Sequence, residues 1–119
     1  MNEIFEKEMK TILKDEYHDF MESLQLSPVK AFYLNPLKQD PNKYLNQQYI
    51  RPHPVVQEGY YFDYEKYPLG KSPFFSCGLY YIQEPSAMLV AHFLDVQEDD
   101  YVLDMCGAPG GKSCAIASR

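Results

Sequence analysis

The residue types best suited to chemistry lie near the C-terminal end of the chain, in the stretch CGAPGGKS at residues 106–113. An apolar run at 101–105 precedes this stretch and a helix-compatible run follows it, which predicts a strand, a glycine-rich turn and a helix. Such a turn places backbone N–H groups and the positive end of a helix dipole where an anionic group can sit. The stretch therefore predicts a ligand cradle. A tight strand-to-helix connection without a ligand is the alternative.

The spacing of the glycines narrows the choice of ligand. A phosphate-binding P-loop has four residues between its first glycine and the Gly-Lys-Ser/Thr, whereas Gly107 and Gly111 enclose only Ala108, Pro109 and Gly110. The dinucleotide-binding fingerprint also fails, because Pro109 stands where its second glycine belongs. A nucleotide hydrolase is therefore disfavoured.

The remaining polar candidates fit structural roles better than catalytic ones. Glu84 precedes Pro85 and fits a helix-start residue better than a catalytic base. His53 fits a solvated histidine and His92 a packed one, because neither has a paired Cys, Asp or Ser at a telling spacing. One run of aromatic residues fits core and sheet-face positions better than base-stacking platforms, because no Lys or Arg is interleaved with it: Tyr60, Tyr61, Phe62 and Tyr64.

Composition limits the class of protein. The chain has 119 residues, of which 45% are hydrophobic and 24% charged, which is typical of one globular domain. Its formal net charge of -6 has the wrong sign for a self-sufficient nucleic-acid binder. Cys77, Cys106 and Cys114 match no zinc spacing, so we expect reduced thiols, no metal site and a cytoplasmic protein. No apolar run approaches the roughly 18 residues of a membrane helix.

Periodicity predicts the elements that position these residues. Apolar residues at three- and four-residue steps predict an amphipathic helix over 4–24. Strands are expected at 29–34, near 55–56 and at 60–64, and a short strand or turn up to residue 82. A helix apolar nearly all round, hence buried, is expected from 85 to about 94, followed by a buried strand at 101–105 and a further helix from 111.

Three sequence motifs together resemble those of a known family. The stretch VLDMCGAPGGKS resembles the first motif, VLDLCAAPGGKT, of the Sun-family RNA 5-methylcytosine methyltransferases, and GLYYIQEPSAM resembles that family's G-x-Y-x-Q-E-x-S-S block. FYLNPLK is similar to a third signature, R-V-N-T-L-K, but has Tyr33 and Pro36 in place of its Arg and Thr. The resemblance covers essentially the whole chain and is strongest over 78–113. Within the family, the layout is most similar to the bacterial small-subunit ribosomal RNA methyltransferase F type.

This resemblance implies S-adenosylmethionine as the cofactor and methyl transfer to carbon 5 of a ribosomal RNA cytosine as the reaction. It also implies that one loop contacts the cofactor near its methionine end: Cys106, Gly107, Ala108, Pro109, Gly110, Gly111 and Lys112. Asp104 could bond the loop or approach the cofactor's ammonium group, and both roles stay open. In the family the nucleophilic cysteine lies in later PCSG and TCS blocks, which this chain lacks, so we expect it beyond Arg119.

We therefore expect an α/β fold in two parts. Residues 1–76 would form an N-terminal α+β accessory domain that positions RNA, and residues 77–119 would begin a Rossmann-like methyltransferase domain with its first helix, strand and helix. The chain would be the N-terminal part of a larger enzyme, inactive by itself. That enzyme would act on ribosomal RNA or a ribosomal subunit, with no metal or membrane partner. A non-catalytic module that positions RNA or a partner without using the loop is the alternative.

Overall fold

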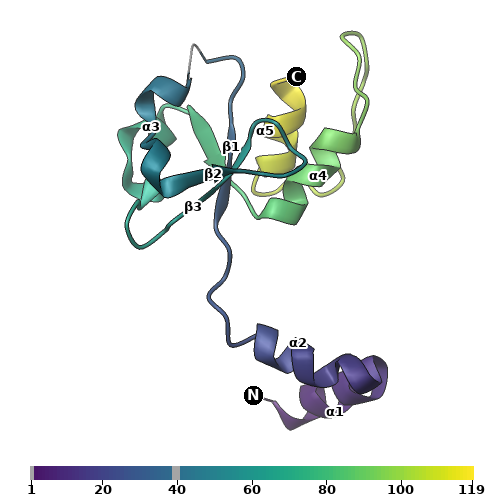
Figure 1. The fold of residues 1–119 in the computed structure, drawn as a ribbon. Coiled ribbons are helices and arrows are strands. Elements are labelled where there is room, and N and C mark those ends of the chain that lie inside the picture. Colours follow the sequence, from purple (N-terminus) through teal and green to yellow (C-terminus); the bar gives the residue numbers. More distant parts are fainter. Residues whose placement is uncertain (1, 39–40) are drawn as a thin grey trace.

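The computed structural model describes residues 2–38 and 41–119. Its N-terminal part is a helical hairpin set apart from the sheet (Figure 1). Helix α1 (Glu3–Leu13) is followed by a 3-10 turn (Lys14–Glu16) and helix α2 (Tyr17–Ser23). The predicted single helix over 4–24 is thus broken, at Lys14 with φ 48°. Folding back brings the rings of Phe5 and Phe20 to 6.3 Å between centroids, so the two apolar faces partly cover each other, which one straight helix does not allow.

A four-stranded antiparallel sheet forms the centre of the molecule, in the order β2-β3-β1-β4. Strand β1 (Ala31–Leu34) lies inside the sheet between β3 (Gly59–Phe62) and β4 (Tyr80–Ile82), and all four of its residues are buried. Strand β2 (Ile50–Pro52) pairs with β3 at one edge. The chain is therefore a mixed α and β protein, and the strands predicted around 29–34, 60–64 and up to 82 are confirmed.

The strand predicted near 55–56 is wrong. These residues lie in the turn between β2 and β3, where the N–H groups of Val55 and Val56 donate to His53 Nδ1 at 3.2 and 3.0 Å. Pro52 and Pro54 flank His53, and proline cannot donate to a strand ladder, so the chain turns here. Val56 is nevertheless buried, because the turn folds back onto the sheet.

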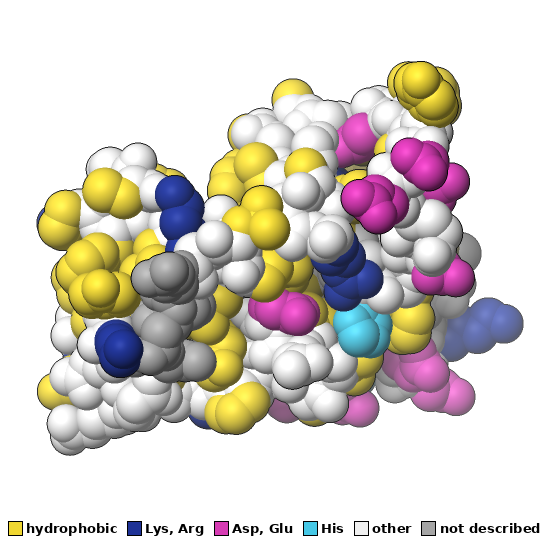
Figure 2. Space-filling view, turned by 90° about the horizontal axis from the view of Figure 1, so that it is seen from above, with side chains coloured by type: hydrophobic (Ala, Val, Ile, Leu, Met, Phe, Trp, Pro, Cys, Tyr) yellow, Lys and Arg dark blue, Asp and Glu magenta, His cyan; other side chains and the backbone are white. Residues whose placement is uncertain are grey.

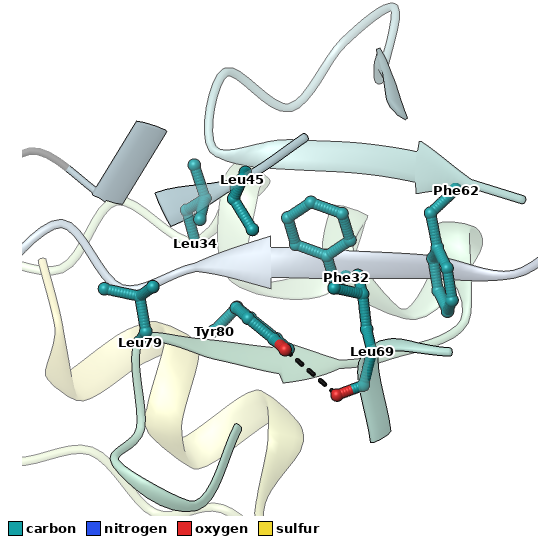
Figure 3. Packing of buried hydrophobic residues seen from close by; sticks show 7 residues of the cluster. All are labelled: Phe32, Leu34, Leu45, Phe62, Leu69, Leu79 and Tyr80. Carbon is teal, nitrogen blue, oxygen red and sulfur yellow. Dashed lines mark hydrogen bonds between the residues drawn. The ribbon is translucent and has the colours of Figure 1, made fainter. Parts of the chain in front are cut away.

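One face of the sheet carries an aromatic and aliphatic core (Figure 3). Its buried members are Phe32, Leu34, Leu45, Phe62, Leu69, Leu79 and Tyr80. Phe32 is fully buried and stacks on Tyr60 at 5.5 Å between ring centroids. The Tyr80 hydroxyl donates to the Leu69 carbonyl at 2.9 Å, which satisfies its buried polar group. Short helices complete this side: 3-10 turns Pro41–Tyr44, Gln47–Tyr49 and Leu69–Lys71, and α3 (Pro73–Ser76).

Two helices cover the other face of the sheet, and they lie side by side in Figure 1. Helices α4 (Pro85–Phe93) and α5 (Gly111–Ala117) confirm the helices predicted from 85 and from 111. The second core gathers buried residues from both helices and from β1 and the turn after β2: Ala31, Tyr33, Val56, Met88, Ala91 and Ala115. The expectation that α4 is buried all round is wrong, since Val90 is 51% and Phe93 73% exposed.

The predicted buried strand at 101–105 is absent. The segment has no regular structure, and the side chains of Tyr101, Leu103 and Met105 are exposed. A strand that is buried on both faces needs other strands paired beside it. Within the described residues, no strand pairs with segment 101–105. Figure 2 shows that hydrophobic side chains from several parts of the chain are exposed on one face of the molecule.

Candidate functional site

Asp104 ties together the two ends of the glycine-rich loop. Its Oδ1 accepts from the Cys106 N–H at 2.9 Å and its Oδ2 from the Ser113 hydroxyl at 2.6 Å. The Ser113 hydroxyl, followed by the Cys106 N–H, lowers the pKa of Asp104 below its ordinary 3.8, because both stabilise the carboxylate. Of the two roles considered for Asp104, the structure shows the bond to the loop.

Two of the loop glycines are needed for different physical reasons. Gly110 has φ 111° and precedes the first turn of α5, a left-handed conformation that L-residues with a side chain rarely adopt. A Cβ on Gly110 would meet only Cys114 Sγ, at 4.0 Å, so the space beside it is open. A Cβ on Gly111 would lie 2.9 Å from a ring carbon of Tyr81 and 3.0 Å from Gln83 Nε2. Gly111 therefore permits the close packing of α5 on β4, while the space beside Gly110 stays open.

The loop rests on β4, which carries the second motif. The Tyr81 hydroxyl donates to the Pro109 carbonyl at 3.2 Å, and the Gln83 side chain lies against Gly111. Gln83 Oε1 is buried and has no hydrogen-bond partner, which is unusual and costly for an amide oxygen. Sequence reasoning did not single out Tyr81 and Gln83. Their place in the GLYYIQEPSAM block was the signal that could have found them.

The other predicted loop residues lie around this cradle. Cys106, Ala108 and Pro109 are exposed, while Gly107 and Lys112 are half-buried. The three cysteines are free and exposed. No group of His, Cys, Asp and Glu among residues 2–38 and 41–119 could hold a metal ion.

Glu84 is confirmed as a helix-start residue. Its Oε2 accepts from the Ala87 N–H at 3.0 Å and from the Ser86 hydroxyl, which caps the first turn of α4. The Ser86 hydroxyl is the main cause that lowers the pKa of Glu84. A carboxylate held in its ionised form by a cap is a poor candidate for a base that must take up a proton at neutral pH.

The two histidines singled out in the sequence are structural as well. His53 accepts the turn N–H groups through Nδ1 and stacks on Tyr61 at 5.3 Å, so it is half-buried rather than fully solvated. His92 is half-buried on α4 as expected, and its carbonyl accepts from Arg119 at 3.1 Å.

Comparison with known proteins matches the chain to one family. The family profile described as the N-terminal domain of 16S rRNA methyltransferase RsmF matches residues 1–85. The chain belongs to this family. A ribosomal RNA small subunit methyltransferase F of Vibrio vulnificus (strain YJ016) is 34% identical in an alignment of 127 residues. The alignment covers 98% of the chain and 27% of that protein. The protein of the same description from Erwinia tasmaniensis is also 34% identical, over 97% of the chain. The protein of the same description from Salmonella paratyphi B is 41% identical over 59% of the chain.

The RsmF family assignment confirms the resemblance found in the motifs. The chain spans about a quarter of the length of these relatives, 27% in the Vibrio protein. The family match ends at residue 85, directly after Gln83 and Glu84 of the second motif, and the Vibrio alignment extends over the glycine-rich loop as well. In the part of the chain that the structure describes, no helix is both long and apolar enough to cross a membrane.

Proposed function

We propose that the chain is the N-terminal part of an S-adenosylmethionine-dependent ribosomal RNA cytosine-5 methyltransferase, with the loop from Cys106 to Lys112 as part of the cofactor site. One observation carries the proposal: the two sequence motifs lie against each other in space. The Tyr81 hydroxyl donates to the loop carbonyl of Pro109, and the side chain of Gln83, whose Oε1 is buried and unpartnered, lies beside Gly111. A buried polar atom without a partner requires an explanation, and a ligand that completes the site would supply one.

The residues present fit S-adenosylmethionine. Its ammonium group is a donor of the kind that the Gln83 amide oxygen lacks, and its carboxylate suits the N–H groups that the first turn of α5 leaves without intrahelical partners. Gly110 keeps the approach to the loop free of a side chain. When bound, the cofactor supplies an electrophilic methyl group. The residues of this chain then hold its methionine end and fix its orientation.

The same proposal assigns the unpaired segment 101–105 a place in a Rossmann-like sheet. Its apolar side chains suit a strand flanked by two others, and α4 and α5 would flank that strand as the first helices of the cofactor domain. The division into an accessory domain at 1–76 and a cofactor domain at 77–119 stays a prediction. Strand β4, which follows residue 76, hydrogen-bonds to β1.

The nucleophilic cysteine is assigned to a part of the enzyme outside these 119 residues. In the family that the motifs resemble, the nucleophile lies in PCSG and TCS blocks, which these 119 residues lack. The larger enzyme would be cytoplasmic and would act on ribosomal RNA or a ribosomal subunit.

The test is methyl transfer by the full-length enzyme that we propose contains this chain. The enzyme is incubated with S-adenosylmethionine labelled in its methyl group and with small-subunit ribosomal RNA, and the RNA is digested to nucleosides. We expect the label in 5-methylcytidine. Label in another nucleoside would contradict the assigned reaction, and unlabelled RNA would favour the non-catalytic module instead.

A further inference from the structure

The acidic charge of the chain is concentrated away from its sheet. Residues 2–23, which form the helical hairpin, carry seven acidic residues and three lysines, and residues 95–104 carry five acidic residues and no Lys or Arg. Residues 24–94, which include the whole sheet, carry six basic and five acidic residues. Most acidic side chains on the face shown in Figure 2 lie toward one side of it. The net charge of -6 therefore comes from the segments outside the sheet, and the part of the chain that includes the sheet is not acidic overall.

An open pocket of about 890 Å³ lies in this less acidic part, along the outer edge of the sheet. Its walls are the segment before β1, strand β2 and the turn after β3. Backbone bonds hold these walls together, since the Phe62 N–H donates to the Lys30 carbonyl at 3.1 Å and the Asp63 N–H to the Tyr49 carbonyl at 3.0 Å. The pocket is thus part of the folded sheet.

Two cations lie beside aromatic rings in the pocket, although no Lys or Arg stands between those rings in the sequence. The Arg51 guanidinium from β2 lies over the Tyr61 ring of β3, 4.7 Å from its centroid. The Lys30 ammonium lies 5.9 Å from the centroid of the Tyr64 ring. Both distances are within the reach of a cation–π attraction, which holds each cation beside a ring. The pairing of β2 with β3 places Arg51 opposite Tyr61, and the pairing of β1 with β3 brings the segments of Lys30 and Tyr64 together, which sequence spacing does not show.

The acidic residues of the pocket weaken its positive charge only in part. Asp63 Oδ1 accepts from the N–H groups of Glu65 and Lys66, both at 3.1 Å, and its Oδ2 lies 3.4 Å from the Lys66 ammonium. These contacts, led by the Lys66 N–H, lower the pKa of Asp63. The Asp63 charge is thus used within the turn. The lining also holds Lys30 and Arg51, both exposed, and one further acid, Glu65.

We propose that this pocket binds a single-stranded segment of RNA. A base would stack on the ring of Tyr64, which is 56% exposed, while Lys30 and Arg51 would contact the flanking phosphates. Exposed rings beside cations are the usual means by which proteins hold unpaired bases and their backbone. The identity of the polymer rests on the proposed function, whereas the geometry of the pocket does not.

The test measures binding of a fluorescent single-stranded RNA oligonucleotide to the 119-residue chain by anisotropy, without S-adenosylmethionine. Tyr64→Ala is expected to weaken binding about fivefold or more, as loss of a stacking platform does. Arg51→Ala should weaken binding and reduce the slope of log affinity against log salt by about 0.7. Tyr44→Ala and Lys71→Ala are matched controls, since both residues are exposed and lie outside the pocket, and they should leave affinity unchanged.

A blunt RNA duplex of the same sequence separates stacking from general phosphate attraction. We expect weaker binding of the duplex and no effect of Tyr64→Ala on it. Absence of single-stranded RNA binding, equal affinity for the duplex, or equal losses in the control variants would overturn the proposal. Because neither cofactor nor methyl transfer enters the assay, failure here leaves the proposed methyl transfer standing, and failure of methyl transfer leaves this pocket testable.

Discussion

Asp104 shows at the scale of one residue how the loop keeps its shape. Its two carboxylate oxygens bond opposite ends of the loop, one at Cys106 and one at Ser113. Because both bonds favour the ionised form, the folded loop and the carboxylate charge are linked. A ligand that binds the loop would find it already closed at its base.

The pH dependence of the loop follows from this linkage. The pKa of Asp104 is lowered in the folded chain, so its stabilising contribution is present above the unfolded value and is lost as pH falls through the folded pKa. We expect the amide resonance of Cys106 to titrate with a midpoint below 3.8 in NMR spectra. Ser113→Ala removes the largest cause and should move the midpoint upward. A midpoint at or above 3.8 in the unaltered chain would argue against the bond.

Cys106 is the residue most easily mistaken for the nucleophile, because it opens the loop. Cys106 is a free, exposed cysteine, and its N–H donates to the Asp104 carboxylate. In the full-length enzyme we expect Cys106→Ala to reduce methyl transfer at most a few-fold and to leave covalent trapping on 5-fluorocytosine RNA intact. Loss of both, with cofactor binding preserved, would make Cys106 the nucleophile and refute its proposed place in the cofactor cradle.

At the scale of elements, the packing of α5 on β4 determines the site. Gly111 begins α5, and the ring of Tyr81 on β4 is anchored through its hydroxyl to Pro109 on the other side of the contact. This close approach joins the two motifs, which are separated along the chain by α4 and the acidic turn.

Gly111→Ala should therefore destabilise the fold. Its Cβ would lie 2.9 Å from the tethered Tyr81 ring, and overpacking of this kind costs about 1–3 kcal/mol. Urea unfolding followed by circular dichroism measures the loss. Gly70→Ala is the control, because its Cβ would meet only Ile82, at an ordinary 3.5 Å. Equal stabilities of the two variants would show that α5 can move away from β4 at little cost.

The sequence predicted most helices and three of four strands, and it failed where tertiary contacts decide. Periodicity identified β1, α4 and α5 because their apolar spacing is local. Periodicity missed the break in the helix at Lys14, because the contact between Phe5 and Phe20 that stabilises the hairpin is tertiary. It assigned a strand to 101–105, whose apolar composition suits one only beside other strands. The loop residues formed a recognisable motif in the sequence. The contact of the Gln83 side chain with Gly111 arises from tertiary packing, which residue spacing does not show.

At the scale of the whole molecule, the loop forms only one wall of the proposed cofactor site. Within the described residues, it contacts β4 and α5, while the apolar segment before it remains exposed. A ligand of this size is normally enclosed over most of its surface, so one wall provides only part of the binding free energy. The chain also spans only 27% of its Vibrio relative.

The 119-residue chain by itself should accordingly bind S-adenosylmethionine weakly and transfer no methyl group. Isothermal titration calorimetry on the chain measures the first point, and we expect a dissociation constant well above the micromolar range. A low micromolar value would mean that the loop and β4 suffice for binding, and that the rest of the site matters less than proposed.

The most direct test of the central claim is cofactor binding by Gly110→Val in the full-length enzyme. A β-branched side chain resists φ 111° and would occupy the open space beside the loop. Calorimetry with S-adenosylmethionine, next to Gly70→Val as the control and circular dichroism for the fold, makes the comparison. We predict that Gly110→Val stays folded and loses measurable cofactor binding while Gly70→Val retains it. Unchanged affinity in a folded Gly110→Val enzyme would contradict the assignment of the loop from Cys106 to Lys112 to the cofactor.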